Sequence, residues 1–137
     1  MMNFIDNNAI HDAGVDAAAG TSRVNGDSID TANAECITFT ATFGTIANNA
    51  VTALVVQTSD TGSGAWADVA RTTVPASADN DTYVIELVKP LKRYARACIT
   101  RGTANATVKS GLAILSYARK KPAPHGSTVS AEKTIDG

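Results

Sequence analysis

The side chains that could ligate a metal or act as nucleophiles are few and lie far apart in the sequence. The chain has two cysteines, Cys36 and Cys98, and two histidines, His11 and His125. Zinc sites bring Cys and His together at short spacings such as Cys-x-x-Cys, and these residues show no such spacing. Nucleophilic catalysis needs a Ser or Cys within reach of a histidine, and both histidines fall in terminal segments that we expect to lie outside the folded domain. The residue types therefore predict neither a metal site nor a nucleophilic enzyme.

An Asp-Thr-Gly-Ser tetrapeptide at positions 60–63 matches the signature sequence of aspartic proteases. In those enzymes two large apolar residues precede the aspartate and bury it beside a second carboxylate, which separates the two pKa values. Here Thr58 and Ser59 precede Asp60. The tetrapeptide also lies in a glycine-rich run, residues 58–64, that is typical of a hairpin loop. A small protease built on Asp60 is the weaker alternative to this loop.

Two other charged runs could bind an ion or an acidic partner. Residues 79–81, Asp-Asn-Asp, cluster oxygen ligands as a calcium loop does, but the glycine and the glutamate that complete an EF-hand loop are missing. We interpret this run as a solvated turn. The basic residues Arg119, Lys120 and Lys121 follow the last predicted strand. They form either a solvated rim or a docking point for an acidic surface or a phosphate.

The composition suits a single domain with one thin core. A chain of 137 residues is long enough to bury such a core. Apolar residues make up 44% of the chain but aromatic residues only 5%, so small and β-branched side chains have to fill the interior. The formal net charge of −1 lacks the positive excess that binding to nucleic acid requires. No apolar stretch is long enough to predict a membrane span.

The first residues lack the basic and apolar segments that direct secretion. We therefore expect the protein to be made in a cytoplasm. A reducing compartment favours two buried free thiols at Cys36 and Cys98. An inter-sheet disulfide is the alternative that a secreted sandwich would favour.

The stretch of residues 82–100 predicts two strands joined by a corner. Residues 83–88 form a short apolar and β-branched run. Pro90 ends this run because proline lacks the N–H of a central strand, and it favours an extended Lys89. Residues 94–100 alternate small or apolar side chains with larger or polar ones, which is the period of a strand.

Further strands are predicted on both sides of this stretch. Residues 36–43 alternate apolar and polar side chains, mostly threonines, and residues 50–57 and 65–71 flank the loop at 58–64. Residues 106–119 form the last predicted strand. Six to eight strands without a long helical pattern predict an all-β fold, an antiparallel β-sandwich of jelly-roll type, over residues 28–121.

Both terminal segments lack the apolar periodicity that would fold them onto this core. Residues 1–27 are rich in Asn, Asp, Ala and Gly, and residues 122–137 are polar. We expect two extended arms that gain order by binding a neighbour. Their scattered apolar residues and the basic run are the predicted partner contacts: Phe4, Ile5, Ile10, Val15, Arg119, Lys120, Lys121, Val129 and Ile135.

The corner sequence carries a resemblance to known sandwiches. Residues 87–96, which include Pro90 and Tyr94, resemble the approach to the tyrosine corner of immunoglobulin and fibronectin type III domains. Together with Trp66 in the preceding hairpin, Pro90 and Tyr94 are expected to support the fold. Truncating Trp66 or Tyr94 to alanine is expected to cost roughly 3 kcal/mol in a core so short of aromatics.

The chain as a whole is similar to head decoration proteins of tailed bacteriophages. The similarity rests on Ser-Ile-Asp-Thr at 28–31, on the hairpin over residues 56–69 that carries Trp66, and on the polar C-terminal arm. Such proteins are small β-sandwich or jelly-roll modules that tie neighbouring major capsid protein subunits together.

This resemblance implies a structural virion protein on the capsid exterior, made in the cytoplasm of a bacterial host. It also implies a dimer or trimer with no catalytic residue, metal or cofactor, and no nucleic-acid or membrane partner. The alternative is a carbohydrate-binding module of a phage tail or fibre that uses Trp66 and Tyr83.

Overall fold

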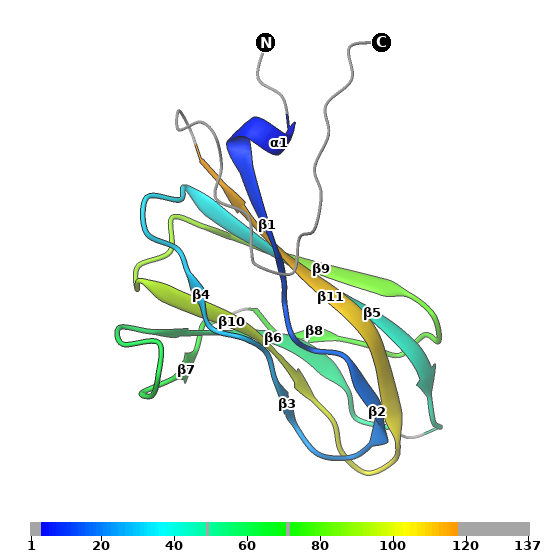
Figure 1. Ribbon diagram of the computed structural model, residues 1–137. Coiled ribbons are helices and arrows are strands. Elements are labelled where there is room, and N and C mark those ends of the chain that lie inside the picture. Colours follow the sequence, from blue (N-terminus) through cyan, green and yellow to red (C-terminus); the bar gives the residue numbers. More distant parts are fainter. Residues whose placement is uncertain (1–3, 49, 71, 118–137) are drawn as a thin grey trace, which may run out of the picture.

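The computed structural model describes residues 4–48, 50–70 and 72–117, which form a sandwich of two antiparallel sheets (Figure 1). Within these residues one short helix precedes the strands. The elements are α1 (Phe4–Asn7), β1 (Asn8–Asp12), β2 (Ala17–Gly20), β3 (Val24–Asn25), β4 (Ile29–Asp30), β5 (Cys36–Ile46), β6 (Ala53–Ser59), β7 (Ala67–Asp68), β8 (Val74–Pro75), β9 (Thr82–Val88), β10 (Tyr94–Thr100) and β11 (Ala106–Ser116).

The chain passes back and forth between the two sheets. Sheet A has the order β1-β11-β5-β9, and β2 pairs with the other end of β11. Sheet B has the order β3-β10-β6-β7, and β4 and β8 pair further along β10 and β6. Each of the pairs β1/β2, β3/β4 and β7/β8 is thus one edge strand with an interruption. The resulting strand order is that of a jelly roll, which confirms the prediction of an all-β, jelly-roll-like sandwich.

Alternation along β5 builds the centre of the core. Ile37, Phe39, Ala41 and Phe43 are fully buried between the sheets, and the threonines between them face outward. Because β5 pairs with β11 on one side and with β9 on the other, the same strand holds both neighbours in register. Sheet B adds mainly aliphatic side chains from β6 and β10 to the same cluster.

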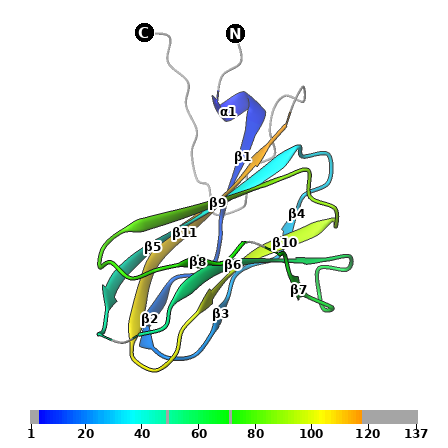
Figure 2. The ribbon, with the colours of Figure 1, turned by 180° about the vertical axis from the view of Figure 1, so that it is seen from behind.

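The prediction that residues 1–27 form an arm outside the domain is wrong. β1 and β2 pair with β11, and β3 pairs with β10. Ala9, Ala13 and Val15 are fully buried members of the core. The sandwich therefore begins at Asn8, well before residue 28. In Figure 2 the blue N-terminal strands lie within the body of the molecule, and α1 extends beyond its end.

Close approach of small residues explains why this segment belongs to the core. A Cβ atom on Gly111 would lie 2.5 Å from Cγ2 of Val15 and 2.6 Å from the backbone oxygen of Thr40. The missing side chain at Gly111 therefore leaves the space that Val15 fills. The backbone N–H of Ala13 also donates to the oxygen of Gly111 at 3.0 Å. Alanine and valine at irregular spacing bury this segment without the strict alternation that marks a strand in a sequence.

Other boundaries of the predicted elements also differ. β6 extends to Ser59, beyond the predicted strand at 50–57. The predicted strand at 65–71 shrinks to the two residues of β7, and β11 ends at Ser116 rather than at 119. The predicted C-terminal arm, residues 122–137, lies outside the described residues.

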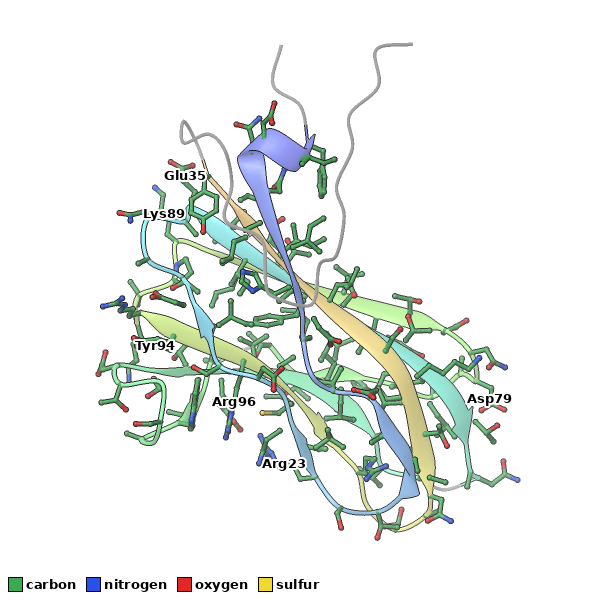
Figure 3. All side chains as sticks on the ribbon, viewed as in Figure 1. Arg23, Glu35, Asp79, Lys89, Tyr94 and Arg96 are labelled. Carbon is green, nitrogen blue, oxygen red and sulfur yellow. The ribbon has the colours of Figure 1, made fainter. Side chains whose placement is uncertain are left out.

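The corner between β9 and β10 differs from the prediction of an extended Lys89. The φ angle of Lys89 is +53°, in the left-handed region that residues other than glycine rarely adopt. Its backbone N–H donates to the oxygen of Glu35 at 2.7 Å, and this bond holds the chain in the corner before Pro90. Figure 3 shows Lys89 beside Glu35 at one end of the sandwich.

The two cysteines face opposite sides of the sandwich. Cys36 precedes the inward-facing Ile37 on sheet A, and Cys98 lies between the core residues Ala97 and Ile99 on sheet B, so each thiol lies on the outward face of its own sheet. Both thiols are free, but the prediction that both are buried holds only for Cys98. Cys98 is buried, whereas Cys36 is partly exposed.

A matched pair of valines tests whether the N-terminal segment belongs to the core. Val15→Ala removes methyl groups from a fully buried site and is expected to lower the free energy of unfolding by about 2 kcal/mol. Val51→Ala makes the same change at a side chain that is 65% exposed and should alter stability by less than about 0.5 kcal/mol. Chemical denaturation measures both. Equal, small effects would mean that residues 8–20 do not pack as described.

Candidate binding face

The outward face of sheet B carries a cluster of arginines, aromatic rings and their polar partners. On β10, Ala95, Ala97 and Ile99 point into the core, so Tyr94 and Arg96 point away from it. Figure 3 shows Arg96 and Arg23 on the side of sheet B that faces away from sheet A. We call this surface the arginine–aromatic face; its residues are Arg23, Asp30, Gln57, Trp66, Asp68, Arg93, Tyr94 and Arg96.

Arg96 is held by an aromatic ring and by its neighbour on β6. Its guanidinium carbon lies 4.4 Å from the centroid of the Trp66 ring, within the range of a cation–π contact. Gln57 stands opposite Arg96 in the β6–β10 register, and its Oε1 accepts hydrogen bonds from Nε and Nη2 of Arg96 at 3.0 and 2.8 Å. Contacts within the chain therefore order the side chains of Arg96 and Trp66.

Further hydrogen bonds tie this pair to the strands on either side. The Gln57 amide nitrogen donates to Oδ1 of Asp68 at 2.8 Å, and Nη2 of Arg23 lies 3.6 Å from the same oxygen. Nε of Arg23 donates to Oδ1 of Asn25 at 3.2 Å. The Cys98 thiol also donates to Oε1 of Gln57, at 3.3 Å. One polar network thus joins residues from β3, β6, β7 and β10.

A second group on this face surrounds Tyr94. Arg93 donates from Nε and Nη2 to the two carboxylate oxygens of Asp30 at 3.1 and 2.8 Å, a bidentate pair. The guanidinium carbon of Arg93 lies 5.3 Å from the Tyr94 ring centroid. On the same ring, a Cβ atom at Gly62 would approach within 2.8 Å, so the glycine lets the hairpin loop lie against Tyr94. Hydrogen bonding from Arg93 lowers the pKa of Asp30, and the same bond raises the pKa of Arg93.

The residues of the Asp-Thr-Gly-Ser tetrapeptide occupy this hairpin loop. The Asp60 side chain is 76% exposed, and its carboxylate lies 3.9 Å from Nζ of Lys92. An aspartic protease buries its aspartate beside a second carboxylate, whereas the partner here is a lysine. Among the described residues, no group of three or more His, Cys, Asp and Glu side chains is placed to hold a metal ion.

The side chains of Asp79 and Asn80, in the run at 79–81, accept hydrogen bonds that hold a turn. Oδ1 of Asp79 accepts the N–H of Ile46 at 2.8 Å, and Oδ1 of Asn80 accepts a hydrogen bond from Nζ of Lys109 at 2.8 Å. The φ angle of Asn80 is +59°. These contacts explain the polar run as turn structure.

The predicted partner contacts in the N-terminal segment differ in how far they are exposed. Phe4 is 55% exposed on α1, and Ile5 is partly exposed. Ile10 is partly buried on β1, opposite Ile114. Val15 is fully buried, so its prediction as a contact residue is wrong. The remaining predicted contacts, Arg119, Lys120, Lys121, Val129 and Ile135, lie outside the described residues.

The aromatic residues expected to support the fold lie outside the core. Trp66 and Tyr94 are partly exposed on the outward face of sheet B, and Pro90 stands in the corner after β9. Tyr83 instead packs at the core margin, where its ring meets Phe43 edge-on at 5.5 Å between centroids. Trp66 and Tyr83 therefore do not form the single sugar-binding platform that the carbohydrate-binding alternative requires.

Six residues of this face were not predicted as site residues from the sequence: Arg23, Asp30, Gln57, Asp68, Arg93 and Arg96. Arg96 and Tyr94 could have been found, because both occupy alternate positions of a clearly predicted strand. The others are brought to Arg96 by pairing between segments distant in sequence.

Comparison with protein-family models and with curated proteins finds no match for this chain. Within the described residues, no helix has the length and the hydropathy that crossing a membrane would take.

A double-mutant cycle tests the contact between Trp66 and Arg96. Because Trp66 is only partly buried, Trp66→Ala should cost about 1 kcal/mol rather than the 3 kcal/mol of a core ring. The cycle of Trp66→Ala, Arg96→Ala and the double variant should show a coupling of roughly 0.5 to 1 kcal/mol in denaturant unfolding. Additive effects would mean that the two side chains do not interact.

The pH dependence of Asp30→Asn tests the ion pair with Arg93. Because the pKa of Asp30 is lowered in the folded protein, the pair contributes stability above the unfolded pKa of about 3.9 and loses it as pH falls through the lowered folded value. Asp30→Asn should therefore be slightly less stable than the parent protein at pH 7. The difference should shrink below about pH 4. A difference independent of pH would exclude the ion pair as its source.

Proposed function

We propose that this protein is a structural virion protein that binds the outside of a phage capsid and cements neighbouring major capsid protein subunits. The sequence resemblance to phage head decoration proteins supports this proposal, and the jelly-roll sandwich is the fold that the resemblance implies. The proposed role requires no catalysis and no cofactor. It works through surfaces, and the candidate partners are the major capsid protein and further copies of the chain in a dimer or trimer.

The arginine–aromatic face is the observation that carries this proposal. Trp, Tyr and Arg are the residue types that dominate the binding energy of protein interfaces. Here Trp66, Tyr94, Arg93 and Arg96 share one outward face, and each ring has an arginine stacked against it. Because these side chains are already ordered by contacts within the chain, little further rotamer entropy is lost when a protein surface covers them.

The charges on this face suit a polar protein surface. Arg23 is paired with Asp68, and Arg93 is paired with Asp30, so cations and anions alternate. Such a pattern presents both donors and acceptors to a partner, without the uniform positive field that nucleic acid favours. Modest contacts to several capsid subunits then add, because the second contact of a bound module is effectively intramolecular.

Substitutions on the two outward sheet faces test this role. Trp66→Ala and Arg96→Ala should each weaken binding to undecorated capsids by at least about tenfold, since truncating a hot-spot side chain costs about 2 kcal/mol or more. Thr40→Ala on the outward face of sheet A is the matched control and should bind like the parent protein. Co-sedimentation over a range of protein concentrations gives the affinities. Unchanged affinity for both variants would place the interface elsewhere.

A further inference from the structure

The strand β9 forms an open edge of sheet A. The other three sheet edges are each interrupted, into β1/β2, β3/β4 and β7/β8, and such breaks limit pairing with further strands. β9 instead runs without interruption and keeps a regular register with β5 from Thr82 to Val88. Among the described residues no strand pairs with its other side, where Figure 2 shows β9 at the margin of its sheet. A continuous edge of this kind can accept an additional strand.

The backbone groups that β9 directs to its open side alternate along the strand. The N–H of Lys89 donates to the oxygen of Glu35 at 2.7 Å, and the oxygen of Asp81 accepts the N–H of Phe43 at 3.0 Å. These bonds direct the odd-numbered residues toward β5, because a residue of an antiparallel strand directs its N–H and its C=O to the same neighbour. The even-numbered residues therefore direct theirs to the open side: Thr82, Val84, Glu86 and Val88.

The charges beside this edge differ between its two ends. Asp79 and Asp81 precede β9, whereas Lys89 follows it. Asp81 and Lys89 are both exposed, and neither forms an ion pair within the described part of the chain. Such a strand is complementary to its own copy in the antiparallel direction, because the acidic end of each meets the basic end of the other. Parallel pairing of two copies would instead place like charges together.

One antiparallel register satisfies both the backbone groups and the charges. It places Ile85 opposite Ile85 of a second copy, on a two-fold axis, and Val84 opposite Glu86 of that copy. It also sets Lys89 opposite Asp81 of the second copy, at both ends of the paired strands. All seven residues of β9 then pair. Moving the axis to Val84 or to Glu86 shortens the paired region, and the move to Glu86 also sets two carboxylates opposite each other, which destabilises a sheet.

An apolar cleft lies beside the end of the paired strands. Its volume is about 310 Å³, and its walls include Leu87 and Val88 of β9, Val69 after β7, and Leu91 in the corner. Val88 is 61% exposed and Leu91 is 99% exposed. In the register above, Tyr83 of the second copy stands opposite Leu87. The second copy thus brings an aromatic residue beside the cleft, which removes part of this apolar surface from water.

We propose that two copies of this chain pair through β9 in antiparallel fashion, about a two-fold axis at Ile85, so that their A sheets join into one continuous sheet. Each copy supplies the same surface, so the contact closes at two subunits and favours the dimer over the trimer. Edge pairing buries few side chains, so the dimer is reversible, with a dissociation constant on the order of 10 to 100 μM. Pairing is measured on the isolated protein, so it goes beyond the proposed capsid role and can fail independently of it.

Charge exchange in the full-length chain tests the register. Sedimentation equilibrium at low salt, up to about 0.5 mM protein, should show a monomer–dimer equilibrium. Lys89→Glu and Asp81→Lys should each raise the dissociation constant roughly tenfold, because each places like charges opposite one another at both ends of the interface. The double variant restores opposite charges and should return the constant to within about threefold of that of the parent protein.

Asp16→Lys is the matched control for these variants. It makes the same change as Asp81→Lys at an exposed site between β1 and β2, on another edge of sheet A, and should alter the dissociation constant by less than about twofold. A chain that stays monomeric at about 0.5 mM, or that forms a trimer, would overturn the proposal. A dimer that the single variants do not weaken, or that the double variant does not restore, would overturn it as well.

Amide hydrogen exchange gives a second measurement without substitutions. The N–H groups of Val84, Glu86 and Val88 point to the open side and should exchange about fivefold more slowly at about 0.5 mM than at about 5 μM protein. Those of the hairpin loop at residues 60–64, which lies outside the proposed interface, should exchange at the same rate at both concentrations. If the β9 amides show no dependence on concentration, or if the loop amides slow equally, β9 is not the contact between copies.

Discussion

The small size of the interior side chains determines how many segments of the chain must pack into the core. Ala9, Ala13, Ala41, Ala97 and Ala113 are all fully buried, and aromatic residues form a small part of the core. Each alanine removes little apolar surface from water, so the stabilisation per residue is small. The sandwich therefore needs every segment that can supply an inward-facing strand. This explains why the N-terminal residues pair with β11 and β10 instead of forming an arm, and why β5 is buried between two neighbours along most of its length.

The same constraint accounts for where the large polar and aromatic side chains lie. Trp66 and Tyr94 lie outside a core built mostly from smaller residues, and an arginine packs against each ring on the outward face of sheet B. The result is an ordered, polar surface on one side of the molecule. β9 presents the opposite kind of surface, a regular backbone edge with an apolar cleft beside it. The first suits side-chain recognition by another protein, and the second suits pairing with an extended segment.

The sequence predicted the elements whose burial follows a strict period of two. β5 and β10 were expected within a few residues of their observed bounds because their inward positions alternate, and β9 because Pro90 ends its apolar, β-branched run. The N-terminal strands were missed because Ala9, Ala13 and Val15 do not alternate, and the space for Val15 is made by a glycine nearly a hundred residues later. The arginine–aromatic face was predicted in part. Trp66 and Tyr94 were identified, but as fold-supporting residues, and their polar partners come together only through long-range pairing of β6 with β7 and β10.

The proposed role on a capsid surface is tested most directly by the protein composition of purified phage particles. Quantitative mass spectrometry should find the chain on the order of hundreds of copies per particle, in a fixed ratio to the major capsid protein that symmetric decoration imposes. A handful of copies per particle would instead place the protein on a tail or fibre. Its absence from particles would contradict the structural role altogether.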